Sequence, residues 1–218
     1  MSLPQKFDEA LQKAIGVRAV WLPGSPIKVG DIVVRRDDQF YEIGKLTDFD
    51  VEAEVAPHSE ISGLNIRSST TKQTIFQLDA EVTDVDAIAD DIAAKVKYEF
   101  KSKDEFVLKT PVLTGESIQN MLRIARALSK QADWKHDKYY IVEKVLGATD
   151  WSFLGTSEAS RSFELSGKGS AIKSFLTVGA SLGLSKTGNL SVEMMGKQGV
   201  VGMGLVRIRK DGTINHGD

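Results

Sequence analysis

Residues 170–196 read SAIKSFLTVGASLGLSKTGNLSVEMMG, and apolar and polar side chains alternate along most of this stretch. The apolar positions are Ile172, Leu176, Val178, Ala180, Leu182 and Leu184, followed after a KTGN segment at Lys186 by Leu190, Val192 and Met194. Alternation with a period of two is typical of a β-strand with one apolar face. We therefore predict a long β-hairpin that turns at the KTGN segment.

A second segment, residues 64–100, shows the same alternation in two separate runs. Its apolar positions are Leu64, Ile66, Phe76 and Leu78 in the first run, and Ile92, Ala94, Val96, Tyr98 and Phe100 in the second. Lys95, Lys97 and Glu99 occupy positions between the apolar residues of the second run. Charged residues in this pattern predict a strand with one face toward water. We therefore predict strands in both runs.

The middle of this second segment also fits an α-helix. Its apolar residues at helical spacing are Val85, Ile88, Ala89, Ile92 and Val96, and Thr83 or Asp84 would cap the helix. The sequence leaves two interpretations open. The segment is either a strand whose pattern is ambiguous, or a helix in one state and a strand in another. The second interpretation needs two packings of similar free energy.

The composition is that of an ordinary globular protein. The 218 residues are 41% hydrophobic and 27% charged, with a formal net charge of −2 and no cysteine. A net charge this small gives no long-range attraction to nucleic acid, so we expect no nucleic-acid partner. We expect a single domain over residues 1–218 in the α+β class, with a twisted, mostly antiparallel β-sheet and a few packed helices.

Two amphipathic helices are predicted. The first, in MSLPQKFDEALQKAIG, carries a stripe of Phe7, Leu11 and Ile15 flanked by Lys6 and Lys13. This is a weak form of the interfacial pattern, so we expect the helix to contact a membrane or a neighbouring subunit, with packing on the sheet as the alternative. The second helix lies in TGESIQNMLRIARALSKQ, residues 114–131, and its first threonine is expected to cap it.

No catalytic site emerges from the sequence. The stretch GASLG, residues 179–183, matches the G-x-S-x-G pattern of hydrolases, but its serine lies within a predicted strand and not at a strand–turn–helix elbow. The histidines, His58, His136 and His216, are isolated and lack metal-ligand spacing. We expect no enzyme activity, no catalytic residue, no metal and no cofactor.

A transmembrane helix is not predicted, because no run of about 18 apolar residues is present. A membrane-spanning strand needs only about 9–11 residues, so the two alternating segments are long enough to form one.

Several stretches, taken in chain order, resemble the bacterial gasdermins, short relatives of the pore-forming gasdermin N-terminal domain. The opening stretch GVRAVWLPGSPIKVGDIVVRRDDQFYEIGKL resembles their first strands. The stretches VKYEFKSKDEFVLKTPVL and KYYIVEKVLGATDWSFLG follow in the expected order, and GKQGVVGMGLVRIRKDG resembles the closing strand. The resemblance covers residues 16–212, which is almost the whole chain.

This resemblance implies a cytosolic protein held inactive by a short C-terminal peptide until a partner protease removes that peptide. The released domain would assemble into a large homo-oligomeric ring in the inner membrane and kill a phage-infected cell. Two hairpins of the family lengthen into membrane-crossing strands, and they match the two alternating segments of this chain. The implied partners are the lipid bilayer, further copies of the chain and an activating protease.

Two features depart from the family pattern. Some bacterial members carry a lipidated cysteine near the N-terminus, whereas this sequence has no cysteine. The sequence also stops at TINHGD, shortly after the last predicted strand, so we expect little or no C-terminal inhibitory peptide here. The alternative function is a soluble binding or assembly module that uses its sheet edges for protein contacts.

Overall fold

The computed structural model describes residues 1–37, 39–179, 184–188 and 190–216. The chain divides into two compact units, each with its own core. Unit 1 comprises residues 1–10, 61–113 and 148–198, and unit 2 comprises residues 11–60, 114–147 and 199–218. Helix α1 and four of the strands contribute residues to both units.

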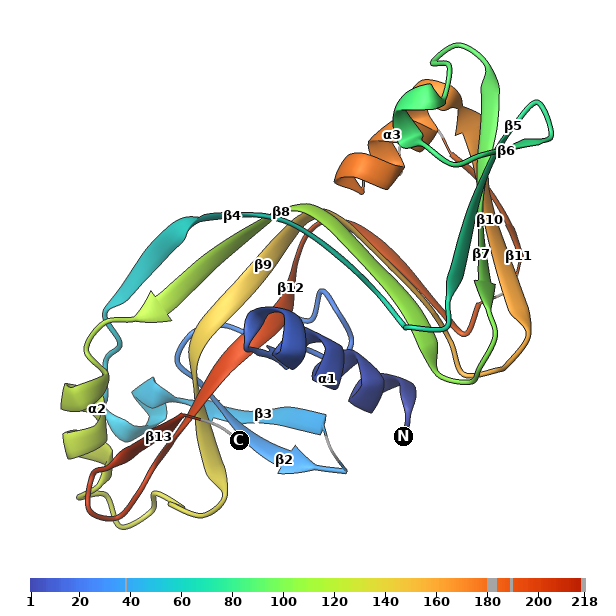
Figure 1. The fold of residues 1–218 in the computed structure, drawn as a ribbon. Coiled ribbons are helices and arrows are strands. Elements are labelled where there is room, and N and C mark those ends of the chain that lie inside the picture. Colours follow the sequence, from blue (N-terminus) through green and yellow to red (C-terminus); the bar gives the residue numbers. More distant parts are fainter. Residues whose placement is uncertain (38, 180–183, 189, 217–218) are drawn as a thin grey trace. The chain divides into compact units, whose positions relative to one another are not determined.

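The helices and strands follow one another along the chain as coloured in Figure 1. Their bounds are α1 (Leu3–Ile15), β1 (Arg18–Ala19), β2 (Asp31–Arg36), β3 (Gln39–Lys45), the 3-10 helix η1 (Leu46–Phe49), β4 (Val55–Arg67), β5 (Lys72–Gln77), β6 (Ala80–Val82), the 3-10 helix η2 (Val85–Ala87), β7 (Ala93–Phe100), β8 (Glu105–Ile118), α2 (Met121–Leu128), β9 (Tyr139–Thr156), β10 (Arg161–Lys168), α3 (Gly169–Val178), β11 (Ser185–Gly188), β12 (Val192–Ile208) and β13 (Ile214–His216).

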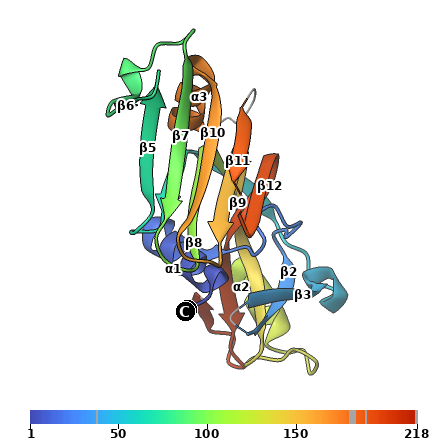
Figure 2. The same ribbon diagram turned by 90° about the vertical axis from the view of Figure 1, so that its right-hand side faces the viewer.

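The strands form two sheets. The first has the order β11-β10-β7-β5-β6 and belongs to unit 1, and Figure 2 shows its strands side by side. Each neighbouring pair in this sheet is antiparallel. The second sheet has the order β1-β12-β9-β2-β3, with β13 added to β12, β8 paired with β9, and β4 paired with β8. The predicted α+β class with a mostly antiparallel sheet is confirmed.

Unit 2 packs α2 and two loops onto its strands. Ile124, Ala125 and Leu128 of α2 are buried in a cluster that also contains Trp134 and Ile141. A second cluster is made mostly of strand residues: Val20, Val33, Val142, Val145, Met203 and Leu205. Every apolar strand residue in these clusters removes its side chain from water, which is the main source of stability for a sheet with one covered face.

Helix α2 begins later than predicted. Strand β8 continues to Ile118, so Thr114 lies in a strand and not at a helix cap. The residue before α2 is Asn120, whose side-chain oxygen accepts a hydrogen bond from the backbone N–H of Glu54 at 2.9 Å. Its amide nitrogen donates to the carbonyl of Glu52 at 3.1 Å. These two bonds fix the corner at which the chain leaves the strand.

Helix α1 buries the stripe predicted for it. The side chains of Phe7 and Leu11 are fully buried, and Ile15 is partly exposed. The ring of Phe7 meets the rings of Phe106 and Phe153 edge-on, at centroid distances of 5.3 and 5.0 Å. In this structure, therefore, Phe7 and Leu11 follow the packing alternative and not the exposed, membrane-facing one. Of the helices in the described residues, none is long and apolar enough to cross a membrane.

We expect Phe7→Ala to lower the free energy of unfolding by about 3–5 kcal/mol, because it removes a buried ring that its neighbours cannot replace. Denaturant unfolding followed by circular dichroism measures this change. The matched control is Leu122→Ala on α2, whose side chain is 68% exposed and whose truncation should change stability little. Equal effects of the two substitutions would contradict the packing described for α1.

Candidate functional site

The five-stranded sheet of unit 1 has one apolar face and one polar face. On the apolar face, β7 contributes Ala94, Val96, Tyr98 and Phe100, and none of these side chains is more than 5% exposed. Val96 and Tyr98 have apolar partners across the ladders: Val96 lies opposite Ile75 on β5 and Leu165 on β10, and Tyr98 lies opposite Phe163 on β10. Other partners of the same four residues are polar, namely Gln73, Gln77 and Arg161. Directly paired residues share a face, so Val96, Tyr98 and their apolar partners form the apolar centre of this surface.

The opposite face of the same strands is polar. Lys95, Lys97 and Glu99 of β7 alternate with the apolar residues, and each side chain is about one-third exposed. Lys97 lies opposite Glu164 of β10 and donates a hydrogen bond to Glu99 at 2.8 Å. Lys95 forms an ion pair with Asp79 at 3.6 Å. The predicted separation of apolar and charged residues along β7 is confirmed.

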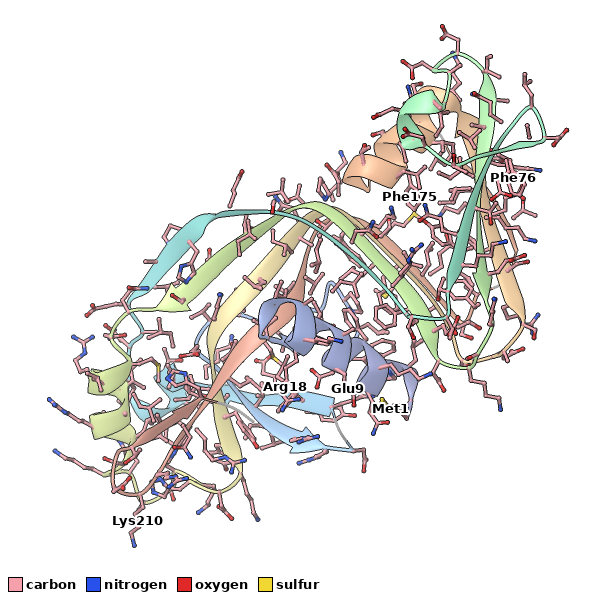
Figure 3. The ribbon with its side chains drawn as sticks, viewed as in Figure 1. Met1, Glu9, Arg18, Phe76, Phe175 and Lys210 are labelled. Carbon is pink, nitrogen blue, oxygen red and sulfur yellow. The ribbon has the colours of Figure 1, made fainter. Side chains whose placement is uncertain are left out.

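Phe76 lies on the polar face, which corrects its predicted grouping with Val96. Its register partner on β7 is Lys95, whose ammonium lies 5.4 Å from the centroid of the Phe76 ring. Figure 3 shows Phe76 on the side of the sheet away from Phe175. The prediction failed because it carried one parity from Leu64 to Phe76, whereas the strand is interrupted between β4 and β5.

Helix α3 covers the apolar face of the sheet. Ile172 and Phe175 are fully buried and Leu176 is 8% exposed, at the i, i+3, i+4 spacing of a helix face. The Phe175 ring meets the ring of Tyr98 edge-on at a centroid distance of 6.4 Å. The alternation in this stretch predicted a strand, and that prediction is wrong for residues 169–178. The alternation places Phe175 between the apolar positions of the predicted strand, whereas in the structure it is a central residue of the helix face.

The N-terminal end of α3 is fastened to the loop between η2 and β7. The backbone N–H of Gly169 donates to the carbonyl of Ile92 at 2.8 Å, and that of Ser170 donates to the carbonyl of Asp90 at 3.0 Å. These bonds satisfy two of the N–H groups that a helix start leaves free. Lys173 adds an ion pair with the Asp90 carboxylate at 2.9 Å. A Cβ on Gly169 would lie 1.9 Å from the carbonyl oxygen of Ala89, so only glycine fits this contact.

The C-terminal end of α3 is held by a buried lysine. Lys109 of β8 is 3% exposed, and its ammonium donates to the carbonyl of Leu176 at 3.0 Å. The same ammonium lies 5.4 Å from the centroid of the Phe175 ring. Gly179 ends the helix in the left-handed conformation, and its carbonyl accepts a hydrogen bond from the Ser152 hydroxyl at 3.3 Å. Burial, with a smaller contribution from the nearby Arg67 guanidinium, lowers the pKa of Lys109 to about 8.

The first predicted hairpin forms from β5 and β7, but only in part as expected. Residues 72–77 pair with residues 94–99, whereas Leu64 and Ile66 lie on β4, which pairs with β8. The helical alternative for residues 85–96 is wrong, because only the short η2 forms and β7 begins at Ala93. Pairing of β7 with a strand on each side favours the extended form. Asp84 does cap η2, accepting a hydrogen bond from the Asp86 N–H at 2.9 Å.

Two apolar residues of this hairpin are exposed. Leu78 is 76% exposed and sits with Asp79 in a turn where both residues have positive φ. Ile92 is 37% exposed and directly precedes β7, at the parity of Ala94 and Val96. Ile92 therefore continues the apolar positions of β7 beyond the part that α3 covers.

The second predicted hairpin differs from its prediction after α3 as well. Ala180 and Leu182 lie outside the described residues, as does Ser181 of the GASLG stretch, and Val178 is the last residue of α3. Leu184 and Leu190 are partly buried against the core of unit 1, and Val192 and Met194 are partly exposed on β12. Residues 185–188 form strand β11, which pairs with β10, so the KTGN segment starts as a strand and not as a turn.

A buried carboxylate closes the base of the first hairpin. Glu105 is 1% exposed and accepts hydrogen bonds from the backbone N–H groups of Lys101 and Ser102, both at 3.0 Å. It also accepts hydrogen bonds from the hydroxyls of Thr70 and Thr71. One side chain thus joins the loop before β5 to the loop after β7. The other end of the hairpin carries no comparable tie to β8 among these described contacts.

Sequence reasoning missed the residues that fasten α3 and the hairpin base. Lys109 follows the apolar residues Phe106, Val107 and Leu108, and a lysine after such a run was the available signal that it serves a buried acceptor. Gly169 and Gly179 flank a nine-residue stretch, and glycines at both ends of such a stretch are typical of the limits of a helix. Glu105 gave no signal, because its partners come from two loops whose meeting depends on the fold.

The arrangement is a two-faced sheet whose apolar side packs against α3, a helix fastened at both ends, and against Val107 of β8 and Leu154 of β9. Removing that helix would expose an apolar surface built from three paired strands, β5, β7 and β10. Water would oppose that exposure, whereas an apolar phase would favour it. The site is thus built to bind apolar surface and carries no arrangement that points to bond-making chemistry among the described side chains.

Comparison with known proteins gives two structural similarities. No protein-family model matches the chain, and no curated protein matches it. The chain is similar to a bacterial gasdermin from Bradyrhizobium tropiciagri, with 14% identity and a TM-score of 0.41, over 96% of this chain and 90% of that one. It is also similar to the Gasdermin A3 membrane pore, with 11% identity and a TM-score of 0.33, over 100% of this chain and 94% of that one. Both are gasdermins, the family that the sequence stretches resemble.

We expect Gly169→Ala to loosen α3, because the new Cβ would overlap the Ala89 carbonyl and force the helix start away from its loop. The free energy of unfolding should fall by about 1–3 kcal/mol, and hydrogen exchange of amides in residues 170–178 should accelerate. Ser170→Ala, at the neighbouring exposed position, is the control and should leave exchange in this segment unchanged. Wild-type exchange rates in Gly169→Ala would contradict the contact.

Proposed function

We propose that the chain is a pore-forming protein whose two hairpin segments cross a bilayer within a large homo-oligomeric ring. The observation that carries this proposal is the two-faced sheet of unit 1. Its apolar face matches what a strand presents to lipid, and its face of Lys95, Lys97 and Glu99 matches what a strand presents to an aqueous lumen. Helix α3 packs on this apolar face, together with Val107 of β8 and Leu154 of β9.

Oligomerisation follows from the hydrogen-bonding requirement of the backbone. Within hydrocarbon, each N–H and C=O group must be paired, and an open sheet edge costs several kcal/mol per unpaired group. The five-stranded sheet ends at β11 and β6, so one copy alone presents edge strands. Pairing of each copy with the next in a closed ring removes these edges. We therefore propose that further copies of the chain are obligatory partners in the membrane.

In the proposed pore, the segment from α3 to β12 becomes the second hairpin. Ile172, Leu176 and Leu184 share one parity in an extended chain, as the sequence alternation requires. Ile172 and Leu176, which pack α3 onto the sheet, would then face lipid, whereas Phe175 has the opposite parity. For Ile172 and Leu176, this refolding exchanges one apolar partner for another, so the apolar area that they bury in the protein core is buried again in the membrane.

The setting of this activity is proposed from the family resemblance. We propose a cytoplasmic protein that a partner protease activates by removing an inhibitory peptide, and that then acts in the inner membrane. Death of a phage-infected cell is the proposed outcome. Expression of the chain in bacteria, with and without the candidate protease, tests this setting through propidium iodide uptake.

A second candidate function is a soluble binding module, and one observation favours it. Strand β3 is the end strand of its sheet, and Tyr41 and Ile43 are 45% and 44% exposed on it. An end strand with exposed apolar residues is a place where another chain can add a strand. This function needs neither lipid nor refolding of α3.

Dye release from liposomes separates the two candidates. A pore former releases a trapped dye from vesicles of phosphatidylethanolamine and phosphatidylglycerol at low protein-to-lipid ratio, and negatively stained detergent extracts of those vesicles show rings. A binding module releases no dye and forms no rings. Intact vesicles at a saturating concentration of activated protein would exclude the proposed function.

We expect Ile92→Asp to abolish dye release while the protein remains folded in solution. The side chain is 37% exposed before insertion, so a carboxylate is tolerated there. In the pore, its parity places it toward lipid, where an acidic residue costs up to a few kcal/mol per subunit, repeated around the ring. The matched control is Ala93→Asp, one residue along and exposed, whose parity places the carboxylate toward the lumen.

Dye release by Ala93→Asp should equal that of the parent protein, and circular dichroism should show that both variants are folded. Release by Ile92→Asp at the parental rate would show that β7 does not face lipid in the assigned orientation. Loss of release in both variants would show that the two faces are not distinguished by the bilayer.

A further inference from the structure

The contact between Lys109 and α3 places a charged group where apolar side chains are the rule. Lys109 is 3% exposed on β8, next to the buried Leu108. The acceptor that the structure gives its ammonium, among the described residues, is the carbonyl of Leu176, in the last turn of α3. The helix C-terminus carries partial negative charge from its free carbonyl groups, so a cation there is attracted to the helix end.

The backbone at the end of α3 also lies close to the backbone of β8. A Cβ added to Gly179, the residue that ends α3, would lie 3.3 Å from the backbone carbon of Lys109 and 3.3 Å from its Cβ. The helix end therefore rests directly on β8 at Lys109. Movement of α3 away from the sheet has to break the hydrogen bond and uncover the ammonium in the same step.

We infer that Lys109 is a positioning residue which fastens the C-terminal end of α3 to β8, and that the protonation state of its amine sets how readily α3 leaves the sheet. We call the form in which α3 covers the sheet the closed form, and the form in which α3 has left the sheet the released form. The ammonium loses most of its hydration in the closed form, and its contacts with one carbonyl and one aromatic ring do not replace that hydration. The neutral amine loses less hydration free energy on burial, and it still donates a hydrogen bond to the Leu176 carbonyl. The closed form therefore favours the neutral amine, and the released form favours the ammonium.

The sign of the pH dependence follows from linkage. The Lys109 pKa is about 8 in the closed form, because of burial and the Arg67 guanidinium, and returns to about 10.5 when α3 is released into water. The released form thus binds more protons, so raising the pH stabilises the closed form between about pH 8 and pH 10.5. Below pH 8 the ammonium is present in both forms, so the closed form carries the full free-energy cost of burying that charge.

The other charged and titratable groups around the contact between Lys109 and α3 lie outside β8. Arg67 is on β4, and Lys173 on α3 is paired with Asp90. Tyr98 of β7 contacts Phe175, and its buried hydroxyl has no hydrogen-bond partner among the described residues. A substitution at Lys109 alone leaves all of these groups in place, so the difference between parent and variant reports Lys109.

The experiment measures the release of α3 in solution, without lipid, so its result is independent of the proposed pore. The chain has no cysteine, and Thr177→Cys on the exposed side of α3 gives one thiol for a spin label. The population with a mobile label should fall roughly 10- to 30-fold between pH 7 and pH 9.5. In the Lys109→Met background this pH dependence should disappear. Lys103→Met, which removes an exposed lysine of the preceding turn, is the control and should keep it.

Equal pH dependence in the parent and in Lys109→Met would overturn the inference. If Lys109→Met does not fold, the unaltered chain provides the second test. Nuclear magnetic resonance titration of the lysine side chains should show one signal with a midpoint well below the others, and this signal should be missing in Lys109→Arg. A set of lysine signals that all titrate near the ordinary value would equally overturn the inference.

Discussion

The packing of α3 against the apolar face of β5, β7 and β10 is the contact on which the rest of unit 1 depends. A sheet with one apolar face is stable in water only when that face is covered, and each large side chain left exposed costs about 1.5–3 kcal/mol. Phe175 and Ile172 provide that cover over Tyr98 and its neighbours. Lipid would meet the same requirement, which is the physical basis of the proposed insertion.

The hydrogen bonds that fasten α3 to its surroundings lie at the two ends of the helix. At the start of α3, backbone groups of the η2–β7 loop accept its first N–H groups, and Gly169 allows the close approach. At its end, one buried ammonium and one hydroxyl hold the carbonyl groups. Tyr98 leaves a buried hydroxyl unpaired beneath the helix, within the described residues. The interface therefore combines large apolar burial with one unpaired buried hydroxyl, which costs free energy.

Sequence patterns predicted the strands better than they predicted α3. The alternation along β7 is set by which residues face the core, and β7 has a strand on each side, so its pattern was readable and its helical alternative failed. The stretch from Ile172 to Leu176 fits a helix and a strand equally, and the choice depends on a contact with β7 that is far away in the sequence. The face of Phe76 depended on a strand interruption that parity alone does not reveal. Lys109 and Glu105 act through partners that only the fold brings together.

The refolding proposed for α3 also changes its reach. Ten residues in an α-helix, at 1.5 Å per residue, extend only about 15 Å, whereas ten residues in a β-strand extend about 33 Å. The hydrocarbon core of a bilayer is about 30 Å thick. In its helical form, this segment is therefore too short to connect the two sides of a membrane, and in its extended form it is just long enough. As a helix, these ten residues lie beside the sheet, and extended as a strand they would have the length needed for one passage through the bilayer.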